Sequence, residues 1–231
     1  MRRIAIIPAK RRSRRLPEKN LLSVDGVPMF AHSVKAAQKA EGIHRVVVSS
    51  EDHEILSIAE RFGAHVHLRD PKLSLDTSTV ADVCKAVLAS EASAGRYYDI
   101  MVVLYATAPL RSTEIVKKVM ELAEQDEVDG ALAVTDYPYS PFQALKFTDG
   151  DTVTPVWPDL VGLKSENLPH VCVDNGSTYA LKTSKFMEFG SFYLPRMKAC
   201  KMPLSESIDL DEPSDLELLN YFIDKKSRSL R

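Results

Sequence analysis

The chain has 231 residues, of which 45% are hydrophobic and 27% are charged, and its formal net charge is −2. A chain of this size can bury the core of one large α/β domain, and no apolar run approaches the roughly 20 residues of a membrane-spanning helix. Its three scattered cysteines suit neither a disulfide framework nor a paired metal motif, and the N-terminal apolar stretch is too short for a signal peptide, so we expect a cytoplasmic protein.

Strand-like and helix-like apolar patterns alternate along the first part of the chain. The first strand, "RIAIIPA", is apolar on both faces, which is typical of a parallel sheet, and Ser50 or Asp52 can cap the second helix. The alternation predicts a doubly wound, Rossmann-like α/β fold with a mostly parallel sheet. In chain order we expect strand 3–9, helix 27–40, strand 44–50, helix 52–63, strand 64–68, helix 77–92, strand 98–110, helix 112–125 and strand 130–135.

The pattern changes at Tyr137. Residues 137–172 contain five prolines and two short β-like runs around a "DGD" turn. They predict an inserted hairpin on a long excursion within a single domain of residues 1–231. The chain then returns to the core with strands at 176–181 and 197–204, and a helix capped by Ser214 follows.

The loop after the first strand is strongly basic. Residues 10–20, here called the basic loop, hold six Lys or Arg side chains and one acidic side chain, Glu18. Residues 1–20 carry a net charge of +7 and the rest of the chain carries −9. A small cationic region on an acidic body excludes a typical nucleic-acid-binding module, which needs a broad basic surface. It suits a compact polyanion such as a nucleoside triphosphate, bound at the carboxyl end of a strand.

Two acidic residues near the other end of the chain form the second motif. Asp209 and Asp211 lie two residues apart in "SIDLDEPSD". In an extended segment they point the same way and can share one Mg²⁺ ion, which prefers one or two carboxylates together with substrate phosphates. A phosphate-binding loop and an acidic metal site together predict phosphoryl or nucleotidyl transfer.

Five segments in order, "IIPAKRRSRRLPEKN", "LRDPKLSLDTS", "LYATAPLRS", "VDNGSTYAL" and "SIDLDEPSDLELL", resemble the motifs of the N-acylneuraminate cytidylyltransferases, or CMP-sialic acid synthetases. The resemblance implies the nucleotide-diphospho-sugar transferase type of fold. It also implies transfer of CMP from CTP to a nonulosonic acid, with release of pyrophosphate and Mg²⁺ as cofactor. It further implies a homodimer, with the 137–172 excursion forming the dimer contact and helping to close the sugar pocket.

The resemblance also assigns roles to residues at matching positions, although four residues of the basic loop depart from the family pattern. Lys10 stands where arginine is usual, and Arg14 replaces a frequent lysine. Arg11 and Arg12 stand where small or polar residues such as Gly-Gly are frequent. The implied catalytic residues are Lys10, Arg14, Lys19 and Asp211, and the implied metal ligands are Asp209 and Asp211. The implied nucleotide-binding residues are Lys10, Ser13, Arg14, Lys19, Asn20, Arg69, Ser78 and Thr79, and the implied sugar-binding residues are Tyr105, Asp174, Asn175 and Tyr179.

The sugar-side motifs leave the acceptor open. Tyr105 replaces a glutamine that is usual in the sialic-acid branch, and "YATAP" is more similar to the branch that acts on pseudaminic or legionaminic acid. A cytidylyltransferase for the eight-carbon acid KDO is the nearest alternative, although that branch usually has proline where Asn20 stands. A nucleotide-binding regulator without catalysis is the alternative from another class. We expect CTP and a nonulosonic acid as partners, and neither nucleic acid nor a membrane.

Overall fold

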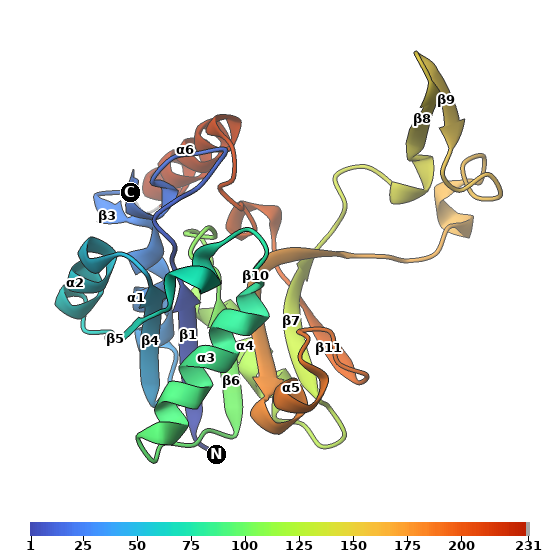
Figure 1. Ribbon diagram of the computed structural model, residues 1–231. Coiled ribbons are helices and arrows are strands. Elements are labelled where there is room, and N and C mark those ends of the chain that lie inside the picture. The colour runs from blue at the N-terminus through green and yellow to red at the C-terminus, as the bar shows by residue number, and fades with distance from the viewer. Residues whose placement is uncertain (230–231) are drawn as a thin grey trace.

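The protein is described by a computed structural model that covers the backbone of residues 1–229 and the side chains of residues 1–225. Its centre is a seven-stranded sheet with the order β11-β7-β10-β6-β1-β4-β5 (Figure 1). Every neighbouring pair is parallel except the two that involve β10, so the predicted mostly parallel sheet is confirmed. The strands are β1 (Arg3–Pro8), β4 (Arg45–Ser50), β5 (His65–Leu68), β6 (Ile100–Leu104), β7 (Gly130–Thr135), β10 (Val173–Lys182) and β11 (Met197–Lys201).

Helices cover both faces of this sheet, as a doubly wound fold requires. The apolar sides of α1 (Met29–Lys39), α2 (His53–Arg61) and α4 (Thr113–Ala123) pack in one buried cluster on the first face. Helices α3 (Val80–Ser93) and α5 (Thr183–Phe189) pack in a second cluster on the other face. Strand β1 contributes to both clusters, because its side chains alternate between the two faces and both are buried.

Side-chain caps begin several of these helices. The carboxylate of Asp52, one of the two expected caps, accepts the backbone N–H of Ile55 at 3.0 Å at the start of α2. Thr79 and Asp82 form a reciprocal capping box at the start of α3. The predicted Ser214 cap is wrong: α6 (Pro213–Ser229) already includes Ser214. Instead Asp215 accepts the backbone N–H groups of Asp211 and Glu212, and its carboxylate suits a helix N-terminus.

A few elements differ from the sequence prediction. Strand β6 ends at Leu104 because the chain leaves the sheet there in a loop, and β10 begins three residues before the expected start. Helix α5 was not expected. A small antiparallel pair, β2 (Ser23–Val24) and β3 (Val27–Pro28), precedes α1 and was also not expected. Both are short, and short elements carry little periodic signal.

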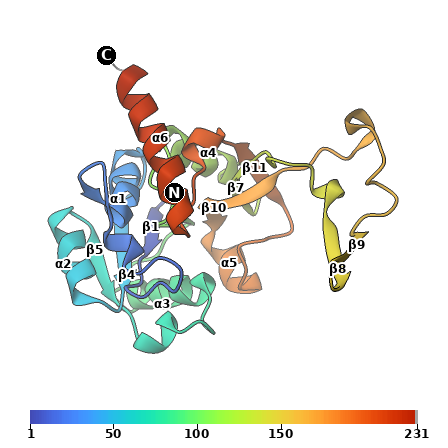
Figure 2. The same cartoon turned by 90° about the horizontal axis from the view of Figure 1, so that it is seen from above.

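The predicted inserted hairpin is present and projects away from the sheet. It consists of β8 (Leu145–Asp149) and β9 (Thr152–Pro155), which pair antiparallel. Residues 136–172, here called the arm, leave the body after β7 and return at the start of β10 (Figures 1 and 2). Several large apolar side chains on the arm are exposed: Tyr139, Leu145, Phe147, Val153, Val156, Trp157 and Leu163.

Topology brings the functional motifs to one edge of the sheet. The loops that follow the parallel strands all leave from their carboxyl ends, which lie at the same edge. Strand β10 runs in the opposite direction, so its first residues, rather than its last, lie at this edge. Helix α6 packs there through a third buried cluster, in which Leu219 joins Leu16 of the basic loop and Leu210 of the acidic motif.

Candidate active site

A cavity of about 270 Å³ lies at the carboxyl edge of the sheet. Its wall is formed by the basic loop, the 69–79 segment with the first residues of α3, the loop after β6, and the acidic pair Asp209 and Asp211. These segments come from both ends of the sequence and from its middle. The cavity is therefore a product of the fold and not of one local motif.

The basic loop places two of its cations in the cavity wall. Asn20 donates a hydrogen bond from Nδ2 to the backbone oxygen of Lys10 at 2.7 Å, which joins the two limbs of the loop at its base. Both Lys10 and Lys19 line the cavity, and Asn20 is buried between them. The loop therefore places two positively charged side chains in the cavity wall, where they can bind phosphate oxygens.

Two other predicted nucleotide residues lie outside the cavity wall. Ser13 is partly buried on the loop tip, and Arg14 has a mostly exposed side chain that forms an ion pair with Asp76. The Nζ atom of Lys10 lies 3.8 Å from the same carboxylate. Asp76 therefore connects the basic loop to the 69–79 segment.

The acidic pair meets the basic loop directly. Lys19 Nζ lies 2.5 Å from Asp211 Oδ1, and Arg15 pairs with the other oxygen of the same carboxylate. The backbone N–H of Leu210, between the two acids, donates to the backbone oxygen of Thr107 at 2.8 Å. This hydrogen bond fixes the acidic segment against the loop after β6.

The two carboxylates have different electrostatic environments. Burial, reinforced by the charge of Asp211, raises the pKa of Asp209, and its Oδ1 atom is buried without a hydrogen-bond partner among the described residues. Burial alone would also raise the pKa of Asp211, but the hydrogen bond and charge of Lys19 and the charge of Arg15 outweigh it and lower that pKa. A hydrogen bond with Thr107 and the charge of Lys19 oppose the shift at Asp209 without overcoming it, so Asp209 is the less compensated of the two carboxylates.

This pair suits a magnesium ion. A buried carboxylate oxygen without a partner is costly unless a cation or donor satisfies it, and Mg²⁺ commonly takes one or two carboxylates and completes its ligands with phosphate and water. Within the described residues no group of three or more His, Cys, Asp or Glu side chains could hold an ion alone. The residues fit an ion shared with a phosphorylated substrate.

The predicted nucleoside side is built from the 69–79 segment. Arg69 is only 4% exposed, donates to the backbone oxygen of Ser49 at 3.1 Å and lies 3.4 Å from Glu51, and its burial lowers the pKa of the guanidinium. Ser78 donates to the backbone oxygen of Lys72 at 2.8 Å. Thr79 caps α3 with its hydroxyl. All three predicted residues line the cavity beside apolar side chains, which suits the flat face of a base.

The predicted sugar side forms a neighbouring cluster at the start of β10. Tyr105 lines the cavity and its ring lies 5.6 Å from that of Tyr179. The Oδ2 atom of Asp174 accepts hydrogen bonds from Tyr179 Oη at 2.8 Å and from Tyr193 Oη at 2.6 Å. Burial and then this hydrogen bond raise the pKa of Tyr179, and the bond to Asp174 raises that of Tyr193 to about 12.

A bulge in β10 joins the sugar side to the metal pair. Pairing with β7 shifts register between Asp174 and Tyr179, and Gly176 in the bulge has a left-handed φ of +64°. A Cβ atom on Gly176 would lie 4.0 Å from Asp209 Oδ2, so the bulge brings the backbone close to the acidic pair. Asn175 donates to Ser207 Oγ at 2.8 Å and ties the bulge to the segment before Asp209.

Sequence reasoning missed three residues at this site. Arg15 reaches Asp211, but nothing distinguishes it from the other loop arginines in sequence. Tyr193 reaches Asp174 from the segment after α5, far from every quoted motif. Arg111 is 5% exposed and donates to the backbone oxygens of Tyr105 and Ser177, and burial lowers its pKa to about 9. The sequence offered one indication of a role for Arg111, which is its position directly after "ATAPL" in a segment that resembles a family motif.

Comparison with protein families matches residues 4–154 to a family described as cytidylyltransferase. Among curated proteins, the chain is 31% identical over 236 residues to the CMP-N,N'-diacetyllegionaminic acid synthase of Legionella pneumophila, with 100% of each chain covered. It is 28% identical over 218 residues to a pseudaminic acid cytidylyltransferase of Campylobacter jejuni, covering 94% of each chain.

Comparison with solved structures finds the same fold. CMP:2-keto-3-deoxy-manno-octonic acid synthetase, in a complex with CTP, superposes with a TM-score of 0.72 over 98% of this chain and 100% of that one. The sequence identity in that superposition is 16%, so it supports the fold and not the substrate.

Proposed function

This chain belongs to the cytidylyltransferase family, and from that premise we propose that it transfers CMP from CTP to a nonulosonic acid and releases pyrophosphate. The observation that carries the proposal is the direct contact between Lys19 of the basic loop and Asp211 of the acidic pair at the cavity. A cationic group for the leaving pyrophosphate and a carboxylate pair for a metal are both needed for nucleotidyl transfer.

The acceptor class follows from the curated relatives. Their names include pseudaminic acid cytidylyltransferase and CMP-N,N'-diacetyllegionaminic acid synthase, and the alignments cover 94% and 100% of those relatives. The tyrosines around Asp174 offer phenol groups and apolar faces beside the cavity, which suits a sugar acid with hydroxyl and acyl substituents. We therefore favour a nonulosonic acid of the pseudaminic or legionaminic type.

In the proposed reaction the anomeric hydroxyl of the acid attacks the α-phosphorus of CTP. The new bond joins the sugar oxygen to the α-phosphorus, and the hydroxyl proton is released to water. The bond between the α-phosphorus and the oxygen that bridges it to the β-phosphate breaks, and that oxygen leaves with pyrophosphate. Lys10 and Lys19 stabilise the charge that gathers on the departing pyrophosphate, because both line the cavity as cations. Arg14 can join them only if its side chain leaves Asp76.

Asp209 and Asp211 would hold Mg²⁺, which neutralises charge at the α-phosphate when it is bound. Asp211 is already ionised by its contacts with Lys19 and Arg15. Asp209 is the residue whose buried charge such an ion would compensate, since its Oδ1 atom is without a hydrogen-bond partner among the described residues.

We also propose that the arm forms the contact of a homodimer. The side chain of Phe147 is 78% exposed and that of Trp157 is 48% exposed on a segment that packs little against its own body, and such apolar groups are typical of interface cores. No helix within residues 1–229 has the length and apolarity needed to cross a bilayer. We propose that the enzyme works in the cytoplasm, where CTP is available.

The central test is pyrophosphate release from CTP with a panel of acceptors. We expect turnover with pseudaminic, legionaminic or N-acetylneuraminic acid in the presence of Mg²⁺, and loss of turnover when EDTA removes the metal. Turnover with KDO alone would indicate that the protein is a KDO cytidylyltransferase and would contradict the proposed acceptor. CTP binding without turnover on any acid would support the non-catalytic regulator.

The dimer has its own test. Light scattering should give twice the monomer mass of 25.7 kDa for the wild type, and the double variant F147S/W157S should shift the protein toward monomer. A monomeric wild type at micromolar concentration would contradict this part of the proposal. The matched control is L218S, which removes an exposed apolar side chain from α6 and should leave the mass unchanged.

A further inference from the structure

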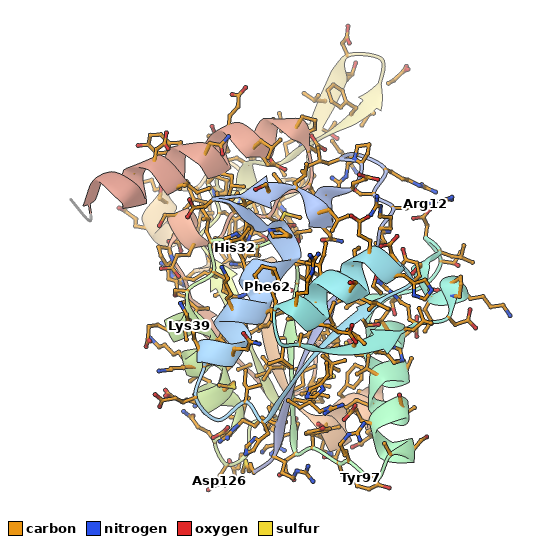
Figure 3. The ribbon with its side chains drawn as sticks, turned by 90° about the vertical axis from the view of Figure 1, so that its left-hand side faces the viewer. Arg12, His32, Lys39, Phe62, Tyr97 and Asp126 are labelled. Atoms are coloured by element: carbon orange, nitrogen blue, oxygen red, sulfur yellow. The ribbon has the colours of Figure 1, made fainter. Side chains whose placement is uncertain are left out.

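Two adjacent arginines on the basic loop have opposite surroundings. Arg12 is exposed, extends away from the rest of the molecule (Figure 3), and makes no hydrogen bond or ion pair with any described side chain. Arg11 is partly buried and contacts three carboxylates. Sequence alone treats the two as an equivalent pair, so the difference between them is a result of the fold.

The Arg11 guanidinium joins the loop to the helix beside it. Its Nη2 atom lies 2.6 Å from Glu18 Oε1, and its Nε atom donates to the same oxygen at 3.1 Å. Its Nη1 atom lies 2.5 Å from Glu54 Oε2 in the first turn of α2. Glu18 stands on the returning limb of the loop, so Arg11 holds both limbs against α2.

The backbone of Arg11 continues this connection to the cavity wall. Its N–H donates to Glu51 Oε1 at 2.8 Å. The other oxygen of Glu51 accepts a hydrogen bond from Ser74 at 2.7 Å and lies 3.4 Å from Arg69. Both Ser74 and Arg69 line the cavity. The loop is therefore fixed to the same framework that forms the predicted nucleoside side.

Long-range attraction of phosphate is a poor explanation for Arg11. Its charge is neutralised locally by Glu18 and Glu54, with Asp52 at 3.8 Å as a third carboxylate. Glu18 itself adopts a left-handed φ of +55°, a conformation that side chains other than glycine rarely adopt without local support. The contacts around Arg11 supply such support at the returning limb.

We propose that Arg11 is a positioning residue that clamps Glu18 to Glu54 and so holds the basic loop preorganised for the triphosphate of CTP. A preformed loop binds its ligand without the ordering cost that a loose loop incurs. The inference rests on the proposed function for its ligand, CTP, but the clamp itself can be tested on the free protein.

The first experiment compares R11A with R12A, which remove the same charge from adjacent positions. We expect R11A to raise KM for CTP about tenfold and to change kcat less than threefold, because the loss falls on binding and not on the chemical step. R12A should change KM less than twofold. Equal increases in the two variants would overturn the proposal in favour of simple charge attraction.

A second variant reverses the sign of the charge change. E18Q/E54Q removes two negative charges near the loop, so attraction alone predicts tighter CTP binding. The clamp predicts weaker binding, similar to that of R11A, and no further loss when R11A is added to it. Calorimetric titration with CTP measures all three variants. Tighter binding by E18Q/E54Q would refute the clamp.

A third measurement needs no nucleotide. Trypsin can cut after Arg14 or Arg15 in both alanine variants, and fragment masses identify these cuts. We expect cutting at least fivefold faster in R11A than in R12A or wild type, with melting temperatures within about 2 °C of each other. Equal cutting would refute the clamp. If wild type transfers no CMP to any acid, the proposed function fails, but this result still decides the clamp.

Discussion

Two charged clusters at opposite edges of the sheet differ in how fully their carboxylates are paired with hydrogen-bond donors and cations. One surrounds Glu91, on α3, beside the amino ends of β4 and β6. The other is the Asp209 and Asp211 pair at the carboxyl edge. Both clusters contain a carboxylate with buried oxygen atoms, but among the described residues only in the first does each oxygen of that carboxylate accept a hydrogen bond.

Both oxygens of the Glu91 carboxylate accept hydrogen bonds. Glu91 Oε2 lies 2.8 Å from Arg45 Nε and accepts hydrogen bonds from Arg96 at 2.6 Å and from Tyr98 at 2.8 Å. Its other oxygen accepts from Arg96 at 2.9 Å. Burial pushes the pKa of Glu91 up, but the hydrogen bonds from Arg96 and Tyr98 and the arginine charges prevail and lower it to about 2.

The acidic pair is only half satisfied. Asp211 has two cations, whereas Asp209 has a raised pKa and an oxygen without a partner among the described residues. A cluster that only stabilises a fold gains by satisfying all its charges. A cluster that binds a charged ligand must keep some of them unsatisfied until the ligand arrives. The comparison therefore separates a structural cluster from a functional one.

The largest expected effect comes from D211N. It removes a carboxylate that contacts both Lys19 and Arg15 and that would hold the metal, so we expect kcat to fall about 10³-fold. CTP binding should change little, because Lys10 and Lys19 remain. Steady-state kinetics with calorimetry of CTP binding checks this. Near-normal turnover would remove the Asp211 carboxylate from the mechanism.

The second effect should appear at the other cluster, and only in stability. E91Q leaves Arg45 and Arg96 without their shared counter-charge, which should lower the free energy of unfolding by about 3 kcal/mol. Urea titration measures this. Activity at 25 °C should be unchanged, and a large loss of kcat in folded E91Q would contradict the division between the two clusters.

The pH dependence sharpens the same division. The folded pKa of Glu91, about 2, lies below its ordinary value of 4.5, so its contribution is present above pH 4.5 and is lost as pH falls toward 2. We expect wild type to lose about 2 kcal/mol more stability than E91Q between pH 5 and pH 2. Parallel acid profiles for the two proteins would count against a lowered Glu91 pKa.

The smallest and most diagnostic effect is on the stability of D209N. Replacing a partly buried carboxylate whose Oδ1 atom lacks a hydrogen-bond partner among the described residues should raise the melting temperature by about 2 °C while activity falls at least tenfold. Calorimetric melting in EDTA, together with a pyrophosphate assay in Mg²⁺, measures both. A lower melting temperature would mean that Asp209 is already satisfied in the free protein.

Local pattern was enough to predict most of the sheet and its helices. Strands β1, β4 and β7 and helices α1 to α4 lie where apolar periodicity places them, because each buries one or both faces against a neighbour. Strand β5 also lies where it was expected, although none of its residues is buried. The prediction of a Ser214 cap was wrong because Glu212, Ser214 and Asp215 could each interact with the start of α6, and the sequence does not indicate which of them does. Helix α5 spans Thr183–Phe189, too few residues for a clear period.

The sequence by itself determined which chemical groups the protein has for its task. It placed a cationic loop after a strand buried on both faces and two acids on either side of Leu210, which is itself fully buried. Such groups follow from local order along the chain. Their residue types already point to phosphate and a divalent cation.

Only the tertiary structure decided which of these groups meet. Leu16 of the basic loop and Leu210 of the acidic segment share one buried cluster with α6, and this packing places Arg15 and Lys19 at Asp211 while Arg14 faces Asp76. The antiparallel direction of β10 likewise places Asp174 at the same edge. These contacts join residues almost 200 positions apart, and burial of apolar side chains, which no local pattern encodes, selects among them.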